Sequence, residues 1–358
     1  MKYITYRKKK YASMLLALAF VSTLTGCGNQ KNTNKDTTPT PTVTAESPTD
    51  KRVVKNGFKL NTIVTITLYG DYDESIIDGA FALCDQYENL LSRTKTSSEI
   101  YQLNNSPDRS LTVSDDTLEL LQTGLNYCSI SNGAFDLSVE PLTSLWNFGN
   151  ENQRLPEPSE INEALTHIGY QDVKIDGNTV TLTKNGMGLD LGAIAKGYIA
   201  DKIKEYLLEQ GVTCATINLG GNVLCVGAKP DGSPFKIGIQ KPYEDRSETI
   251  AVMELGDKSV VSSGIYERYF EVDGVKYHHI LNPSTGYPYD NNLLSVTIVS
   301  DKSTDGDALS TTCFALGLEK GLELIDSMDN TYAVFITKDD QLHYSKGFLE
   351  AIPTLETK

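Results

Sequence analysis

Residues 187–201 read MGLDLGAIAKGYIAD, and this stretch passes from an extended segment into a helix within a few residues. The extended segment ends near Asp190, Gly192 permits a close backbone approach, and a helix is expected over 193–210. Backbone N–H groups and the dipole at such a helix start bind phosphates, and Lys196, about one turn into the helix, reaches the same anion. The alternative is a plain turn capped by Asp190 with Lys196 in solvent, but the dense glycines favour the anion site.

Outward from this turn, the hydrophobic pattern predicts a mixed domain. Apolar residues recur at helical spacing in some segments, and β-branched runs mark the strands. Helices are expected over 74–92, 114–129, 156–168, 193–210, 305–316 and 318–327. Strands are expected over 58–69, 214–219, 223–228, 235–240, 250–255, 268–272, 275–281 and 293–300, with hairpins over 172–183 and 332–345. This order predicts a single α+β domain with antiparallel sheets and flanking helices.

The N-terminus predicts where the protein is located rather than how it folds. Five basic residues precede a short apolar run over 14–21, which is too short to span a bilayer and indicates a secretory signal peptide over 1–26. Leu-Thr-Gly-Cys, ending at Cys27, resembles a lipoprotein cleavage site, so we expect cleavage there and acylation of the thiol, for example by palmitate. The alternative is an ordinary signal with a chance cysteine. Residues 27–52 have a polar composition typical of a flexible tether, and 53–358 form the domain.

Net charge and cysteine spacing limit the classes of function that the chain can have. The formal net charge is −15, and the first 26 residues carry five positive and no negative charges, so the processed chain is near −20. This charge excludes a nucleic-acid binder as a first hypothesis. Beyond Cys27 the cysteines are widely spaced, without a C-x-x-C pair, and are interpreted as buried apolar side chains. One disulfide remains an open alternative. These cysteines are Cys84, Cys128, Cys214, Cys225 and Cys313.

Three other polar clusters lie between regular elements. GAFD at 133–136, followed by LWNFG at 145–149, suits a flat ligand ring with a polar anchor, although a loop with Phe135 and Trp146 in the core is an equal alternative. NLGGN at 218–222, with Ser-Ser-Gly ending at residue 264, is either a ligand-contacting backbone or a plain hairpin. HHILNPSTGYP, beginning at His278, marks a turn without the partners of a zinc site.

The segment DGDALSTT, residues 305–312, carries the candidate metal ligands. Asp307 and Thr311 are four residues apart, so they share one face of a helix. A carboxylate and a hydroxyl are the hard oxygen donors that magnesium accepts together with carbonyl, water and phosphate oxygens. Asp305 is a candidate cap. The alternative is a capped helix start that faces solvent.

Taken in this order, GAFD, DLGAIAKG, NLGGN, HHILNPSTG and DALST resemble the FAD:protein FMN transferase family, also called the ApbE or thiamine-biosynthesis lipoprotein family. The resemblance runs from about residue 60 to 316. It implies an α+β fold that binds FAD as substrate and magnesium as cofactor.

The resemblance also implies site residues. Asp307 would be catalytic as well as a metal ligand, and Thr311 and the backbone carbonyl of Ala193 would complete the protein ligands. The expected FAD contacts are Leu60 (at the start of the first strand), Thr94, Ala134, Phe135, Asp136, Asp190, Lys196, His279 and Leu281.

Four positions depart from the family pattern. Thr94 stands where an aromatic residue is common, so a stacking contact is in doubt. Asn61 and Glu140 each replace a usual glycine. Ser310 stands where some members carry a carboxylate, which puts a second metal in doubt.

The implied reaction is transfer of FMN from FAD to a Ser or Thr hydroxyl of another protein through a phosphoester bond, with AMP released. The implied acceptor is an extracytoplasmic flavoprotein, such as a subunit of a membrane redox complex, and the lipid anchor would hold the enzyme at the outer face of the cell membrane. Two alternatives stay open: an FAD pyrophosphatase giving FMN and AMP, and a non-catalytic flavin-binding lipoprotein.

Overall fold

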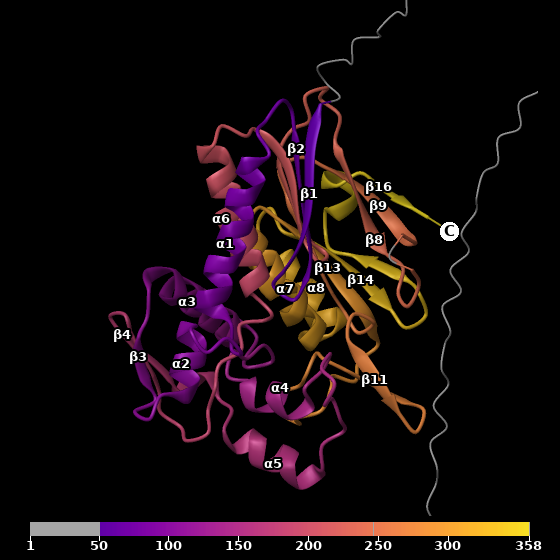
Figure 1. Ribbon diagram of the computed structural model, residues 1–358. Coiled ribbons are helices and arrows are strands. Elements are labelled where there is room, and N and C mark those ends of the chain that lie inside the picture. The colour runs from indigo at the N-terminus through magenta and orange to yellow at the C-terminus, as the bar shows by residue number, and fades with distance from the viewer. Residues whose placement is uncertain (1–50, 246, 358) are drawn as a thin grey trace, which may run out of the picture. The chain divides into compact units, whose positions relative to one another are not determined.

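The computed structural model describes residues 51–245 and 247–357 (Figure 1). The predicted signal peptide, the predicted acylation site at Cys27 and all but the last two residues of the predicted tether lie outside these ranges. Within them, no helix has both the length and the apolar character that crossing a bilayer requires.

An eight-stranded sheet forms the centre of the domain, in the order β1-β2-β6-β7-β10-β13-β14-β15. All neighbouring strands in this sheet are antiparallel. All eight residues of β13 are buried, so the middle of the sheet is covered on both faces. The strands are β1 (Arg52–Lys59), β2 (Thr62–Tyr69), β6 (Cys214–Leu219), β7 (Asn222–Gly227), β10 (Ser259–Gly264), β13 (Leu293–Ser300), β14 (Tyr332–Thr337) and β15 (Leu342–Tyr344).

Helices cover one face of this sheet and a small second sheet lies on the other side (Figure 1). The covering helices are α1 (Ser75–Leu91), α6 (Ala195–Glu209), α7 (Ser303–Leu316) and α8 (Leu318–Asp326). The second sheet has the order β16-β9-β8, and the ring of Tyr69 packs edge-on against Phe235 of β8 at 5.7 Å between centroids. Its strands are β8 (Phe235–Gln240), β9 (Thr249–Leu255) and β16 (Thr354–Glu356).

Most of the remaining elements lie toward the end of the molecule that carries α4 and α5, whereas Phe348 of α9 packs on Tyr332 of β14 and Tyr344 of β15. A second apolar cluster, at the end that carries α4 and α5, surrounds Trp146, which is fully buried and stacks on Phe148 at 5.5 Å. The elements are α2 (Glu99–Asn105), β3 (Ser110–Thr112), α3 (Asp115–Ile130), α4 (Glu140–Trp146), α5 (Pro158–Thr166), a 3-10 turn (Tyr170–Asp172), β4 (Val173–Asp176), β5 (Thr179–Leu182), β11 (Tyr269–Val272), β12 (Val275–His278) and α9 (Phe348–Ala351).

The α+β architecture with antiparallel sheets is confirmed, but several elements differ from the predictions. The single strand expected over 58–69 is a hairpin. Leu60 and Asn61 form its turn with φ of 52° and 57°, so Leu60 does not start the first strand. Such left-handed backbone explains why glycine suits position 61 and why Asn is tolerated there. The strand expected over 275–281 ends at His278, and β10, α2 and α4 were not predicted.

The cysteines behave as predicted. The five in the described part of the chain are free and buried. Burial raises the pKa of each thiol, to about 12 for Cys84, Cys225 and Cys313. They therefore act as small apolar side chains in the core.

Candidate active site

The turn that leads into α6 forms the first part of the site. The N–H of Gly197 donates to Oδ2 of Asp307 on α7 at 2.9 Å. In a helix that began one turn earlier, this N–H would bond to the carbonyl of Ala193. Among the described residues no hydrogen bond reaches that carbonyl. Asp307 therefore takes the bond that the helix backbone would otherwise give to Ala193, and the carbonyl stays available to a ligand.

Close packing of α6 on α7 positions Asp307. A Cβ added to Gly197 would lie 2.2 Å from the carbonyl oxygen of Ser303 and 2.8 Å from Cβ of Asp307. The Asp307 side chain is only 5% exposed, and burial raises its pKa against the opposing effects of the Lys196 charge and the N–H groups at the start of α6. The site therefore contains a buried carboxylate with a cation nearby.

A second carboxylate fixes the same pair of helices from the other side. Asp201 of α6 accepts hydrogen bonds from the N–H groups of Ser303 and Thr304 at 2.8 and 2.9 Å. Helix α7 therefore starts at Ser303, and Asp305 is not its cap. Asp305 instead accepts from the hydroxyl of Tyr127 at 2.7 Å. Asp201 and Asp307 thus cap each other's helix, which fixes the turn before α6 relative to α7.

Thr311 lies one turn along α7 from Asp307, as its spacing predicts. Its hydroxyl is 3.0 Å from Oγ of Ser263 on β10, and Ser310 is 2.8 Å from the same atom. Ser263 belongs to the Ser-Ser-Gly motif, which the sequence left open as a ligand-contacting backbone or a plain hairpin, but the strand that carries it was not predicted. The two β-branched residues before the Ser-Ser-Gly motif were the available signal.

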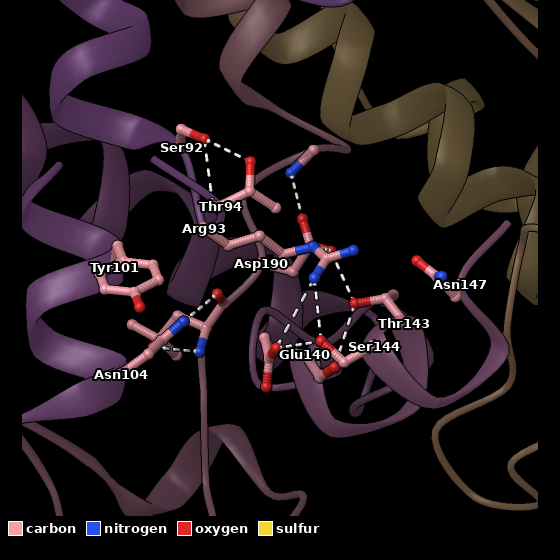
Figure 2. Close-up of polar contacts among 12 residues, drawn as sticks. Ser92, Arg93, Thr94, Tyr101, Asn104, Glu140, Thr143, Ser144, Asn147 and Asp190 are labelled. Atoms are coloured by element: carbon pink, nitrogen blue, oxygen red, sulfur yellow. Dashed lines mark hydrogen bonds and ion pairs between the residues drawn. The ribbon is translucent and has the colours of Figure 1, made fainter. Parts of the chain in front are cut away.

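Asp190 is held from three directions (Figure 2). Its Oδ2 forms an ion pair with Nε of Arg93 at 2.9 Å and accepts a hydrogen bond from Oγ1 of Thr143 at 2.8 Å. Its Oδ1 accepts from the N–H of Gly192 at 2.9 Å. The side chain of Asn104 on α2 makes two hydrogen bonds with Leu189, the residue before Asp190. It accepts from the N–H of Leu189 at 2.7 Å and donates to its carbonyl at 2.9 Å. Arg93 was also missed by sequence reasoning.

The GAFD segment is built into the protein more deeply than its sequence suggests. The Phe135 side chain is buried against Tyr127. Asp136 accepts from the N–H and hydroxyl of Ser138, both at 2.7 Å, and from the N–H of Tyr170 at 3.1 Å, and burial raises its pKa. The side chains of Phe135, Asp136 and Trp146 thus hold the loop together. Contact with FAD at 134–136 stays a prediction.

The remaining predicted contacts lie on separate segments. His279 bonds through its backbone N–H and its Nδ1 to the carbonyl of Arg268, and burial, then the Arg268 charge, lowers its pKa, so the imidazole is neutral. The charge of Lys196 also lowers the pKa of His279. Leu281 is buried in the cluster around Trp146. The Thr94 hydroxyl is 3.1 Å from that of Ser92, and Leu60 lies in the β1–β2 turn.

The NLGGN cluster is a hairpin turn between β6 and β7, as the plainer of the two interpretations expected. Gly220 has φ of 68°, and a Cβ there would lie 2.1 Å from Oγ1 of Thr62. Asn222 accepts from the hydroxyl of Ser303 at 2.7 Å. The turn therefore supports the start of α7.

The donors present fit a magnesium ion. The Ala193 carbonyl in the turn before α6, and the Asp307 carboxylate and Thr311 hydroxyl on α7, are hard oxygens. Magnesium commonly takes few protein ligands and completes its shell with water and phosphate. No cluster of three or more His, Cys, Asp and Glu suited to a metal occurs in the described ranges. A single-carboxylate site that shares a substrate phosphate matches this donor set.

Comparison with known proteins agrees with this geometry. The model of the ApbE family matches residues 60–336. An FAD:protein FMN transferase of Klebsiella pneumoniae is 40% identical over 279 residues, which is 77% of this chain and 86% of the relative. One of Treponema pallidum is 36% identical over 298 residues, 79% of this chain and 82% of the relative.

Solved structures give the same result. The crystal structure of the ApbE protein from Thermotoga maritima has a TM-score of 0.78 at 33% identity and covers 86% of this chain and 100% of that one. The flavin transferase ApbE from Vibrio cholerae has a TM-score of 0.76 at 28% identity over 84% of this chain and 99% of its own. The fold and site therefore define an enzyme of the flavin-transferase class. The chain belongs to the ApbE family.

Proposed function

We propose that this protein transfers the FMN part of FAD to a Ser or Thr hydroxyl of an acceptor protein, with magnesium as cofactor. Similarity to relatives named FAD:protein FMN transferases supports the activity. The observation that carries the assignment to this site is the hydrogen bond from Gly197 to Asp307, because it leaves the Ala193 carbonyl available beside a buried carboxylate.

In the proposed reaction the acceptor hydroxyl oxygen bonds to the FMN phosphorus. The bond between that phosphorus and the bridging oxygen breaks, and AMP leaves with the electron pair. Magnesium held by Ala193, Asp307 and Thr311 would neutralise charge on the pyrophosphate. The Lys196 ammonium attracts the same phosphates, and the start of α6 favours negative charge.

The hydroxyl proton needs an acceptor within the site. Asp307 is the proposed base, because it is the buried carboxylate that lies at the start of α6. The neutral His279 is proposed as a hydrogen-bonding contact to FAD rather than a cationic one.

The test is incubation of the protein with FAD, magnesium and a candidate acceptor flavoprotein, with and without a chelator. We expect the acceptor to gain the mass of FMN less one water, and a chelator to prevent this gain. We also expect flavin fluorescence of the acceptor in a denaturing gel and release of AMP. FMN and AMP without a labelled acceptor would identify a pyrophosphatase. FAD that stays intact but bound would identify a flavin-binding protein.

We also propose that the enzyme is anchored by a lipid on Cys27 at the outer face of the cell membrane, next to an acceptor in a membrane redox complex. The sequence around Cys27 is the support for this proposal. Incorporation of a palmitate analogue that Cys27→Ser abolishes would support the anchor, and incorporation that persists in this variant would contradict it.

A further inference from the structure

Arg93 bridges two carboxylates from different parts of the chain. It follows α1, and its Nε pairs with Asp190 at 2.9 Å. Its Nη1 donates to Ser144 at 2.9 Å and lies 3.6 Å from Oε1 of Glu140. Ser144 in turn donates a short hydrogen bond to Glu140. Figure 2 shows Arg93 between Asp190 on one side and the two α4 side chains on the other.

Glu140 is the second carboxylate of this group and lies at the start of α4. Its side chain lies over Gly188, where an added Cβ would be 2.6 Å from Oε2 of Glu140. A backbone bridge between Val139 and Gly188 brings the two segments together. The packing over Gly188 therefore places the Glu140 carboxylate beside the guanidinium of Arg93.

The charges in this group are only partly exposed to water. The side chains of Arg93 and Glu140 are each 22% exposed and that of Asp190 is 16% exposed. Charges at this depth interact more strongly than on an open surface. Without Arg93, two carboxylates would face each other, and both would repel an anionic substrate. Lys196 lies in the first turn of α6, and Lys95, two residues after Arg93, already pairs with Glu88 at 2.5 Å.

We propose that Arg93 is a positioning residue of the FAD site, whose guanidinium neutralises the Asp190–Glu140 pair so that the negatively charged dinucleotide binds beside them. This inference rests on the proposed function, because it takes FAD to bind at Asp190. Arg93 suits the role because its planar fork pairs with two partners at once while keeping its charge.

The experiment measures the Kd of the full protein for FAD by flavin fluorescence, without acceptor, for Arg93→Met, Arg93→Lys, Glu140→Gln and Arg93→Met/Glu140→Gln. Arg154→Met is the matched control, since Arg154 forms an ion pair with Glu160 at 2.6 Å outside the site. Thermal melting of each variant monitors folding. Steady-state kinetics with an acceptor separate KM for FAD from kcat.

We expect Arg93→Met to raise the Kd and KM for FAD about tenfold, the effect of losing one charge interaction in a partly buried site. The double variant should return to within about threefold of the wild type, since removal of Glu140's charge relieves the repulsion. The Kd of Arg93→Lys should lie between those of the wild type and Arg93→Met. Glu140→Gln alone should bind FAD at least as tightly as the wild type.

A double variant as impaired as Arg93→Met, or an Arg93→Met that melts earlier with an unchanged Kd, would overturn the proposal. If Arg93→Met fails to fold, Arg93→Lys and Glu140→Gln decide: weaker FAD binding by Glu140→Gln contradicts it. A wild-type protein that binds FAD but labels no acceptor would refute the transfer reaction while leaving this test valid.

Discussion

At the scale of single residues, Asp307 combines a structural and a chemical task. One of its oxygens holds the N–H of Gly197, and the carboxylate supplies the charge that a magnesium ligand needs. The two tasks are separable, since an amide oxygen accepts the same hydrogen bond without the charge.

Asp307→Asn should therefore lower kcat for FMN transfer by about 100-fold or more, as expected for loss of a charged group at a phosphoryl-transfer site. The melting temperature should stay near that of the wild type. Asp305→Asn, which lies on the same helix but contacts Tyr127, is the matched control and should keep its kcat. Full activity of Asp307→Asn would show that the metal assignment is wrong.

Helical spacing is local, so the sequence predicted that Asp307 and Thr311 lie on one helix, and α7 confirms this. Their roles as metal ligands stay predictions. The contacts of Arg93 with Asp190 and of Ser263 with Thr311 were not predicted, because the partners are distant in sequence and no local pattern connects them.

At the scale of elements, α6 and α7 act as one unit, joined by two reciprocal caps and by the close approach at Gly197. Such pairing over more than 100 residues is invisible to periodicity, which is why Asp305 was taken for the cap. Short elements were also missed: α2 and α4 have seven residues each, too few to show a helical repeat.

Gly197→Ala should separate the two helices, because the added methyl group would meet the carbonyl of Ser303 at 2.2 Å. We expect a loss of about 1–3 kcal/mol in the free energy of unfolding, with lower transfer activity, measured by urea denaturation and initial rates. Gly256→Ala is the control, since no atom lies within 4 Å of its added Cβ. Equal stability of both variants would contradict the close crossing.

Asp201→Ala should weaken the start of α7. It removes three hydrogen bonds to Ser303 and Thr304, and loss of a helix cap of this kind costs about 2 kcal/mol. Urea denaturation measures the change. Because α7 carries Asp307 and Thr311, we expect the magnesium concentration required for half-maximal activity to rise as well. A variant with wild-type stability would show that the cap contributes little.

At the scale of the whole molecule, the free energy of unfolding depends on pH through a buried histidine. His278 accepts the N–H of Ile280 at Nδ1 and therefore donates from Nε2 to the carbonyl of Tyr289 at 2.9 Å. Burial lowers its pKa to about 4. An unfolded chain takes up this proton as the pH falls through about 6.5, whereas the folded protein does not until about 4. The contribution is fully present above that interval and declines within it.

We expect His278 to reduce the free energy of unfolding by about 2 kcal/mol between pH 7 and pH 5. His278→Gln should lack this part of the pH dependence, while His343→Gln on β15 should keep it. Urea denaturation of the three proteins at both pH values is the measurement. A wild type and a His278→Gln variant with parallel pH profiles would refute the assignment.

Overall architecture followed from the sequence because periodicity and turn residues act locally. The hairpin over 172–183 was predicted from Asp-Gly-Asn, and β4 and β5 confirm it. The β1–β2 turn was missed because Leu60 and Asn61 form it without glycine. Strand β10 was missed because its serines interrupt the apolar pattern of a strand. In the structure it pairs with β7 on one side and β13 on the other.

The buried thiols provide a way to observe motion in this domain. Cys84 and Cys313 lie in helices, Cys214 and Cys225 in neighbouring strands, and Cys128 in α3. A reagent in solution reaches each sulfur only when its element opens. The rate at which each cysteine is alkylated therefore measures how often its part of the fold opens. Comparing Cys313 of α7 with Cys84 of α1, with and without FAD, would show whether substrate binding slows the opening of the helix that carries Asp307.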